Sequence, residues 1–295
     1  MMKAAIHSVP AIAKKLLHSI LLFSVIHLAH AEKIGEGAGV QLADIAGTPI
    51  QLFTYRPSGC TPKAFLLVFH GVARNASTYR NAARPLADRL CMIVAAPLFD
   101  LQRFPTWRYQ KGGLAHKGAI EPAEHWTGQI VPQLAQWLQQ NEGNPALPYF
   151  LIGHSGGAQF LSRVAAVIPN QAQRIVIANP STYVLPSTEE DPPFGLHHLP
   201  DAQSLLRHYL AQPVVILLGQ EDQGTKELDE SGEAQEQGST RLDRGEQTFR
   251  KAQSVASAHG WPFNWKLLEV PGTGHSATSM FRSSQAIEAL TIPAP

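Results

Sequence analysis

The sequence has few cysteines, little charge and only one long apolar run. Two cysteines in 295 residues, Cys60 and Cys91, are too few for a disulfide-rich scaffold, and they stand too far apart for a zinc-ligating pair. Charged residues make up 16% of the chain and leave a formal net charge of +1. This balance provides no strongly basic surface, so neither nucleic acid nor an anionic membrane is expected as a partner.

The one long apolar run lies near the N-terminus and has the pattern of a secretory signal peptide. A lysine-containing start without acidic residues precedes the apolar run 16–29, and the small-x-small motif Ala29-His30-Ala31 ends it. Histidines interrupt the run, which is also too short for a comfortable membrane span. An uncleaved anchor is the alternative to a cleaved leader.

These features lead to an expectation about domains and location. We expect residues 1–31 to be removed during export to the periplasm or the medium, and residues 32–295 to form a single domain. Loss of the leader with its three lysines would change the formal net charge from +1 to −2. No later segment is long and apolar enough for stable insertion into a membrane.

The two cysteines stand where a disulfide bond between neighbouring strands is feasible. Cys60 lies before the apolar run 64–69, and Cys91 lies before the run 92–97. If these runs are adjacent parallel strands, both cysteines lie at the N-terminal edge of the sheet. Because an exported protein meets oxidising conditions, we expect the two to bond. Two buried free thiols are the alternative, since the sequence does not give their distance.

Short apolar runs recur along the chain and indicate buried strands. Most are continuously apolar rather than alternating, which is typical of strands covered on both faces of a sheet. The first is expected as an antiparallel strand at the edge. The runs occupy residues 50–55, 64–69, 92–97, 149–153, 174–179, 214–219 and 265–270.

Amphipathic segments alternate with these runs and predict helices. Residues 124–140 and 158–168 carry apolar side chains at helical spacing, the former with a kink or start near Pro132. Residues 240–260 have a threonine available to cap the start and a glycine at the end. The alternation predicts an α/β fold, with a mostly parallel sheet covered by helices on both faces.

One joint between a strand and a helix carries the motif GHSGG at residues 153–157. This is the setting of a nucleophile elbow, in which a serine hydroxyl is exposed at the tip of a tight turn. The glycines permit the turn, and the N-terminus of the following helix lies behind the serine. We therefore interpret Ser155 as a nucleophile. A serine that merely fills a glycine-rich joint is the alternative.

A nucleophilic serine needs a base, and the base needs a carboxylate that orients it. Asp222 follows the run 214–219, and His275 lies in a glycine-rich loop after the run 265–270. Because the carboxyl ends of parallel strands meet at one edge of a sheet, we expect Ser155, Asp222 and His275 to meet there. Glu221 is the competing carboxylate, and Asp222 is favoured because it lies further into the loop.

The tetrahedral intermediate of acyl transfer needs backbone N–H donors for its oxyanion. Gly156, the residue after the serine, is one expected donor. Val72, which follows the pair His70-Gly71 at the end of a predicted strand, is the other. His70 itself is interpreted as a structural residue rather than a second base.

Together these motifs resemble those of the α/β-hydrolase superfamily. Within it, the chain resembles exported bacterial esterases of the polyhydroxybutyrate-depolymerase and feruloyl-esterase type. The resemblance implies an eight-stranded sheet, a Ser-His-Asp triad and no cofactor. One departure is Val72, since short depolymerases of this type often have a cysteine after the His-Gly pair. The segments that carry the resemblance are HGVARNASTYR (70–80), GHSGG (153–157), LLGQED (217–222) and GTGHSA (272–277).

Three segments, 98–121, 181–200 and 220–239, show no clear periodicity, and each follows the carboxyl end of a predicted strand. Ligands bind at that edge of an open α/β sheet, so the substrate pocket is expected there. The segments contain aromatic residues that could contact an acyl group, and the candidates are Trp107, Tyr109 and Tyr183. Packing of these rings in the core or at its rim is the alternative.

The expected function is therefore hydrolysis of small or polymeric carboxylic esters through an acyl-enzyme. A peptidase or thioesterase with the same triad is the nearest alternative, and a non-catalytic binding member of the fold is a more distant one. No metal site is expected, because the histidines are scattered and the neighbouring pair His197-His198 reads as a solvated pair.

Overall fold

The computed structural model describes residue 1 and residues 33–291. Apart from Met1, the expected signal peptide lies outside the described residues, so its cleavage and the domain boundary after it stay predictions. Within the part of the chain that is described, no helix has both the length and the apolar character needed to cross a membrane.

Eight strands form the central sheet. In chain order they are β1 (Gly37–Ile45), β2 (Thr48–Arg56), β3 (Ala64–Phe69), β4 (Met92–Pro97), β7 (Tyr149–His154), β8 (Ile175–Ala178), β9 (Val214–Gly219) and β10 (Lys266–Val270). Their order across the sheet is β1-β2-β4-β3-β7-β8-β9-β10. The pairs β1–β2 and β2–β4 are antiparallel, and all other pairs are parallel. The predicted mostly parallel sheet of eight strands is thus confirmed.

The edge of the sheet differs from the prediction in one respect. The run 50–55 forms part of β2 and is antiparallel, as expected, but β1 lies outside it as the true edge strand. One face of β1 is covered only in part, with Ala43 and Ile45 buried, and on the other face Val40 and Leu42 are exposed. With no continuous apolar run and two glycines in its first three residues, β1 lacks the pattern by which the other strands were recognised.

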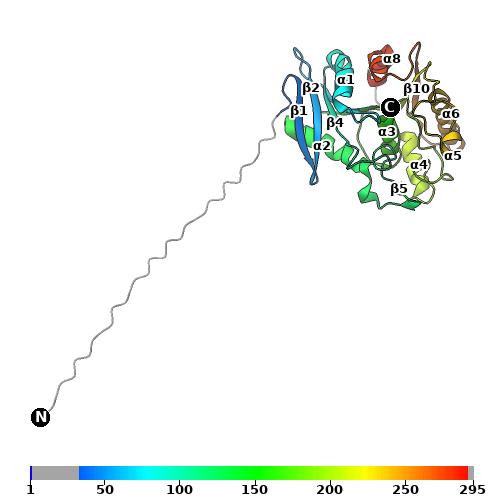
Figure 1. The fold of residues 1–295 in the computed structure, drawn as a ribbon, viewed down its shortest axis with the longest axis horizontal. Coiled ribbons are helices and arrows are strands. Elements are labelled where there is room, and N and C mark those ends of the chain that lie inside the picture. The colour runs from blue at the N-terminus through cyan, green and yellow to red at the C-terminus, as the bar shows by residue number, and fades with distance from the viewer. Residues whose placement is uncertain (2–32, 292–295) are drawn as a thin grey trace. The chain divides into compact units, whose positions relative to one another are not determined.

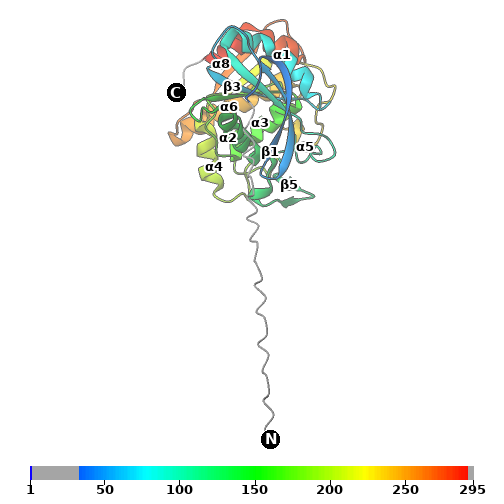
Figure 2. The ribbon, with the colours of Figure 1, turned by 90° about the vertical axis from the view of Figure 1, so that its left-hand side faces the viewer.

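Helices cover both faces of the sheet, and Figure 1 shows β1 and β2 at one side of it and β10 with α6 at the other. Helices α1, α7 and α8 pack on one face, while α2, α3, α4 and α6 pack on the other. In Figures 1 and 2, α1 and α8 accordingly lie on the side away from α2 and α4. The helices are α1 (Ala76–Leu90), α2 (Ile130–Glu142), α3 (Gly156–Val167), α4 (Ala202–Ala211), α5 (Gly232–Gln235), α6 (Arg241–His259), α7 (Ala277–Arg282) and α8 (Ser284–Thr291).

The residues expected to begin and end α6 and to begin α2 have these roles in the structure. The Thr240 hydroxyl oxygen accepts a hydrogen bond from the Asp243 N–H at 3.1 Å, which caps the start of α6. Gly260 ends that helix in the left-handed region with φ of 62°. Pro132 lies in the first turn of α2, where the absence of its N–H costs no helical hydrogen bond.

The predicted disulfide bond between Cys60 and Cys91 is present, with their Cα atoms 6.2 Å apart. Strands β3 and β4 are parallel neighbours, and Ala64 stands opposite Met92 at their start. Cys91 immediately precedes β4 and Cys60 lies in the loop before β3, so the bond ties the N-terminal edge of the sheet. The carboxyl edge, where ligands bind in such folds, lies at the other end of the same strands.

Candidate active site

The bend between β7 and α3 forces Ser155 into an uncommon backbone conformation. Its φ is 57° and its ψ is −119°, a combination that non-glycine residues rarely adopt. The bend is closed by a near contact of two backbones: a Cβ on Gly157 would lie only 2.2 Å from the Phe69 carbonyl oxygen. Glycine is therefore required at position 157, and the tight packing holds Ser155 at the tip of the turn.

The structure brings together the three side chains predicted from separate parts of the chain. His275 Nε2 lies 3.0 Å from Ser155 Oγ, and His275 Nδ1 lies 2.6 Å from Asp222 Oδ2. Asp222 and Ser155 are buried, while the His275 side chain keeps 26% of its surface exposed. In this arrangement the Nδ1–H of His275 donates to Asp222, which leaves Nε2 free to accept the Ser155 hydroxyl proton. The competing carboxylate, Glu221, is exposed to solvent.

Arg241 is a neighbour of this group that sequence reasoning missed. Its side chain is buried on the first turn of α6, with Nη1 3.5 Å from Asp222 Oδ1. The same guanidinium donates to the carbonyls of Gly224 at 3.3 Å and Lys226 at 2.6 Å. Burial lowers the pKa of Arg241, and the Asp222 charge opposes that effect. Because Arg241 lies in a polar stretch at the start of a helix, the sequence predicts an exposed side chain, and no local pattern indicated its contact with Asp222.

The backbones of the two expected oxyanion donors, Val72 and Gly156, pass close to each other. The Val72 nitrogen is 3.2 Å from the point that a Cβ on Gly156 would occupy. Because Gly156 is the first residue of α3, its N–H has no acceptor within the helix. The Gln110 side chain packs against the same point, and it accepts a hydrogen bond from Arg74 at 3.0 Å. Gln110 thus borders the site and is held there by Arg74, although the sequence pattern indicated neither residue.

His70 supports this region as a neutral residue. Its Nδ1–H donates to the Gly71 carbonyl at 3.0 Å, while its Nε2 accepts the Phe99 N–H at 3.0 Å. Burial lowers the pKa of His70 to about 4, so the ring carries no charge at neutral pH. This pattern of contacts is that of a structural residue, as the sequence suggested.

A second neutral histidine lies against the candidate base. The His154 and His275 ring centroids are 4.5 Å apart, and the Tyr79 hydroxyl is hydrogen-bonded to His154 Nδ1 at 3.2 Å. Burial, followed by the nearby charge of His275, lowers the pKa of His154 well below its ordinary value. His154 therefore faces His275 as an uncharged ring and does not compete with it as a base.

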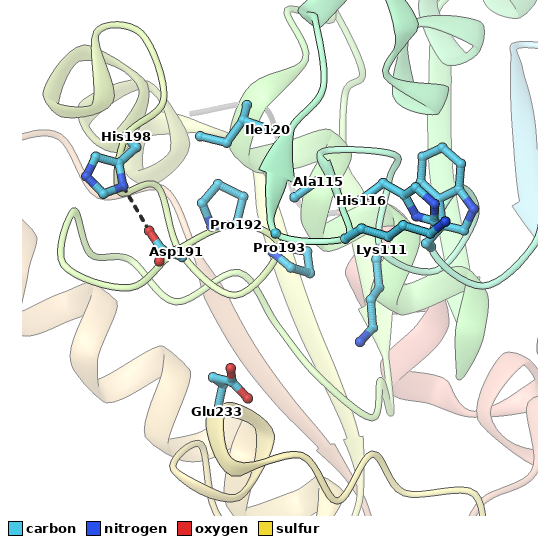
Figure 3. Close-up of a pocket in the computed structure, with 12 residues that line it drawn as sticks. Lys111, Ala115, His116, Ile120, Asp191, Pro192, Pro193, His198 and Glu233 are labelled. Atoms are coloured by element: carbon cyan, nitrogen blue, oxygen red, sulfur yellow. Dashed lines mark hydrogen bonds and ion pairs between the residues drawn. The ribbon is translucent and has the colours of Figure 1, made fainter.

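A pocket of about 630 Å³ is built from the three segments that the sequence left unassigned. Its walls come from residues 107–120, 191–198 and 233 (Figure 3). These segments include the short strands β5 (Ala115–His116) and β6 (Ala119–Ile120) and helix α5. Two short helices, η1 (Ala123–His125) and η2 (Thr127–Gln129), follow the segment 98–121. None of Ser155, Asp222 and His275 belongs to the lining of this pocket.

Of the three aromatic residues predicted to contact the substrate, only Trp107 lines the pocket. Trp107 is half-buried, lines the pocket and stacks on His116 with ring centroids 4.2 Å apart. Tyr109 and Tyr183, by contrast, are fully buried and belong to the apolar core. The Tyr109 hydroxyl donates to the His70 carbonyl at 2.8 Å. Neither tyrosine ring has a surface that a substrate can reach, because the surrounding core already covers both faces.

Two solved structures are similar to this chain over most of its length. The chain is 32% identical to a poly(aspartic acid) hydrolase from Sphingomonas sp. KT-1, with 86% of this chain and 98% of that chain covered and a TM-score of 0.80. It is 29% identical to a poly(3-hydroxybutyrate) depolymerase from Bordetella parapertussis, with coverages of 90% and 96% and a TM-score of 0.82.

A more distant structure shares the fold alone. An S-formylglutathione hydrolase from Agrobacterium tumefaciens is 17% identical, with coverages of 88% and 98% and a TM-score of 0.51. A scan against protein-family models and a search of curated proteins each found no match. From the fold and these similarities, the chain belongs to the α/β-hydrolase superfamily and is a hydrolase.

Proposed function

We propose that the protein is an exported serine hydrolase that cleaves carboxylic esters through an acyl-enzyme. The observation that carries the proposal is the continuous hydrogen-bonded series from Ser155 Oγ through His275 to Asp222, with links of 3.0 and 2.6 Å. Such a series supplies a nucleophile, a base and an orienting carboxylate in the required geometry.

The first half of the reaction forms the acyl-enzyme. Ser155 Oγ attacks the ester carbonyl carbon while its proton passes to His275 Nε2, and the carbonyl oxygen takes the displaced electron pair. The N–H groups of Val72 and Gly156 stabilise this oxyanion. Collapse of the intermediate breaks the bond to the alcohol oxygen, which receives the proton from His275.

The second half repeats the chemistry with water. His275 takes a proton from water, the resulting nucleophile attacks the acyl carbon, and the proton returns to Ser155 as the acid leaves. The exposed fraction of His275 supports this step, because water can reach the base without a large movement of the protein. Asp222 stabilises the imidazolium that forms in both halves.

The bond that is cleaved has a second candidate. Similarity to the poly(3-hydroxybutyrate) depolymerase favours an ester, whereas the 32% identity to the poly(aspartic acid) hydrolase favours an amide in an acidic polymer. One panel separates the two: p-nitrophenyl esters, a thioester, polyhydroxybutyrate film and poly(aspartic acid), compared under equal conditions. Cleavage of poly(aspartic acid) without turnover of any ester would replace the ester assignment.

Ser155→Ala is the direct test of the mechanism. We expect ester turnover to fall at least about a thousandfold, with an unchanged melting temperature, because the change removes only the nucleophilic oxygen. A fluorophosphonate probe should label the wild-type protein at Ser155 and leave the variant unlabelled. Retained turnover in the variant would overturn the assignment, and an unlabelled wild-type protein would favour a non-catalytic binding role.

Export is proposed on two supporting observations, the leader-like N-terminal sequence and the Cys60–Cys91 disulfide bond. N-terminal sequencing of protein recovered from the periplasm or medium should begin at residue 32. Recovery of the protein only in the cytoplasm, with its first 31 residues intact, would contradict this part of the proposal.

A further inference from the structure

Three potential metal ligands converge in the loop between β8 and α4. His197 Nδ1 lies 3.0 Å from Asp191 Oδ1, and His198 Nδ1 lies 3.1 Å from the same oxygen. The three ligand atoms all lie within 4.8 Å of one another. The sequence suggested only a solvated histidine pair, because Asp191 is separated from it by a loop without periodic pattern.

The backbone turns two consecutive histidines toward one point. In an extended chain, successive side chains point to opposite faces. His198 instead adopts φ of 60°, the left-handed region that histidine enters more readily than most non-glycine residues. As a result the His197 and His198 ring centroids are only 3.6 Å apart, and both Nδ1 atoms face Asp191.

The loop that carries these residues is held by its own backbone. The His197 N–H donates to the Glu190 carbonyl at 2.9 Å, and the Gly195 N–H donates to the Asp191 carbonyl at 3.0 Å. Gly195 passes so close that a Cβ there would lie 2.3 Å from the Glu190 oxygen. Lys251 on α6 binds the Glu190 carboxylate at 2.7 Å and fixes the base of the loop. These contacts therefore fix the backbone that carries the three ligand residues.

The distances from Asp191 Oδ1 to the two histidine nitrogens are suited to a transition metal. Imidazole nitrogen and carboxylate oxygen bind Zn²⁺ at about 2.0–2.2 Å, so two adjacent ligand atoms on one ion stand about 2.9–3.5 Å apart. The two nitrogen-to-oxygen distances of 3.0 and 3.1 Å fall within this range. A mixed set of two imidazoles and one carboxylate favours zinc and neighbouring first-row ions over calcium or magnesium, which prefer oxygen.

We propose that Asp191, His197 and His198 form a binding site for one divalent transition-metal ion, with Zn²⁺ as the reference case. Each imidazole binds through Nδ1 as the neutral tautomer, so the proton that it otherwise donates to Asp191 from Nδ1 is carried on Nε2 instead. Three protein ligands leave a coordination position for water or another small ligand. Asp191 and His198 also line the pocket, as Figure 3 shows, so the proposed ion is bound by two of its lining residues.

The proposal is tested by metal binding rather than by activity. Protein expressed as the full chain is treated with chelator, dialysed and titrated with ZnCl₂ by calorimetry, and Co²⁺ is added separately for its visible absorption. We expect Asp191→Asn, His197→Ala and His198→Asn each to weaken the tightest Zn²⁺ site at least tenfold. The His198→Asn change is the sharpest, because asparagine also tolerates the left-handed backbone but has no imidazole.

His116→Ala serves as the matched control, since His116 lines the same pocket but lies outside the cluster. It should bind Zn²⁺ as the wild type does, and circular dichroism should show that all four variants are folded. Co²⁺ should give absorption bands with the wild type and with His116→Ala but not with the cluster variants. Equal affinity in the wild type and the cluster variants, or no wild-type binding at millimolar Zn²⁺, would overturn the proposal.

Discussion

At the scale of single residues, two buried side chains, Arg241 and His70, hold parts of the proposed active site in place. Arg241 contacts the Asp222 carboxylate and two carbonyls of the loop that follows it. His70 joins the strand end that precedes Val72 to the Phe99 backbone. Each of these side chains acts on the proposed chemistry through another residue, so we regard both as positioning residues.

Arg241→Met should lower kcat for a p-nitrophenyl ester about tenfold to a hundredfold, because a hydrogen bond to a charged group contributes about 1.5–3 kcal/mol. KM should change little, since Arg241 does not face solvent. Arg241→Lys should restore part of the loss by returning the charge. Arg250→Met, at an exposed position of the same helix, is the control. An unchanged kcat in Arg241→Met would show that the contact with Asp222 has no role.

The neutral state of His70 predicts how stability depends on pH. Its pKa is about 4 in the folded protein against an ordinary value of 6.5, so the unfolded chain binds the proton more readily. Its contribution to stability is complete above pH 6.5 and is lost as the pH falls toward 4. Between pH 7 and 4.5, the shifted pKa of His70 should lower the unfolding free energy of the wild type by about 2–3 kcal/mol. His70→Gln keeps an acceptor for the Phe99 N–H but does not titrate, so it should lack this part of the pH dependence. Urea unfolding at both pH values measures this, and an identical difference in both proteins would contradict it.

At the scale of elements, the site is assembled by the ends of strands. Ser155 follows β7, Asp222 follows β9 and His275 follows β10, all at the carboxyl edge of the sheet. Asn179, just after β8, links two of these ends: its Oδ1 accepts the Gly219 N–H at 2.8 Å and its Nδ2 donates to the Gly274 carbonyl at 3.5 Å. This buried amide holds the loops that carry the acid and the base.

The joint between β7 and α3 predicts a severe effect of a small substitution. Gly157→Ala should reduce the unfolding free energy by about 3 kcal/mol or more, because its Cβ meets a backbone carbonyl that cannot move independently of β3. Gly232→Ala, where the added Cβ meets nothing within 4 Å, should stay within about 0.5 kcal/mol of the wild type. Denaturant unfolding compares the two, and equal stability of both variants would show that the bend relaxes.

At the scale of the whole molecule, opposite edges of the sheet have different tasks. The disulfide bond closes the N-terminal edge between β3 and β4. The carboxyl edge carries Ser155, Asp222 and His275, and the three long segments that follow strands β4, β8 and β9 build the pocket. We therefore expect that stability and the proposed chemistry can be altered separately.

Replacing both cysteines by serine tests this separation. The chain-entropy estimate for a loop of 31 residues predicts a loss of about 3–4 kcal/mol in unfolding free energy. The kcat of the folded variant should match that of the wild type, because neither cysteine touches the proposed site. Intact mass should first establish that the wild-type protein has no free thiol. A large loss of kcat in folded variant protein would show that the two edges are coupled.

The sequence alone determined the mostly parallel sheet and the meeting of Ser155, Asp222 and His275. Both follow from local patterns, because continuously apolar runs specify covered strands and parallel strands bring their carboxyl ends to one edge. The glycines at the elbow and the cap at Thr240 could also be recognised from neighbouring residues alone.

Only the tertiary structure decided which other side chains are buried and which of them meet. It buried Arg241 against Asp222, enclosed Tyr109 and Tyr183 in the core and brought Asp191 to the two histidines. These outcomes depend on how irregular segments pack on one another. Such segments have no periodic pattern that reports which side chain faces inward, so their contacts are settled only when the whole chain has folded.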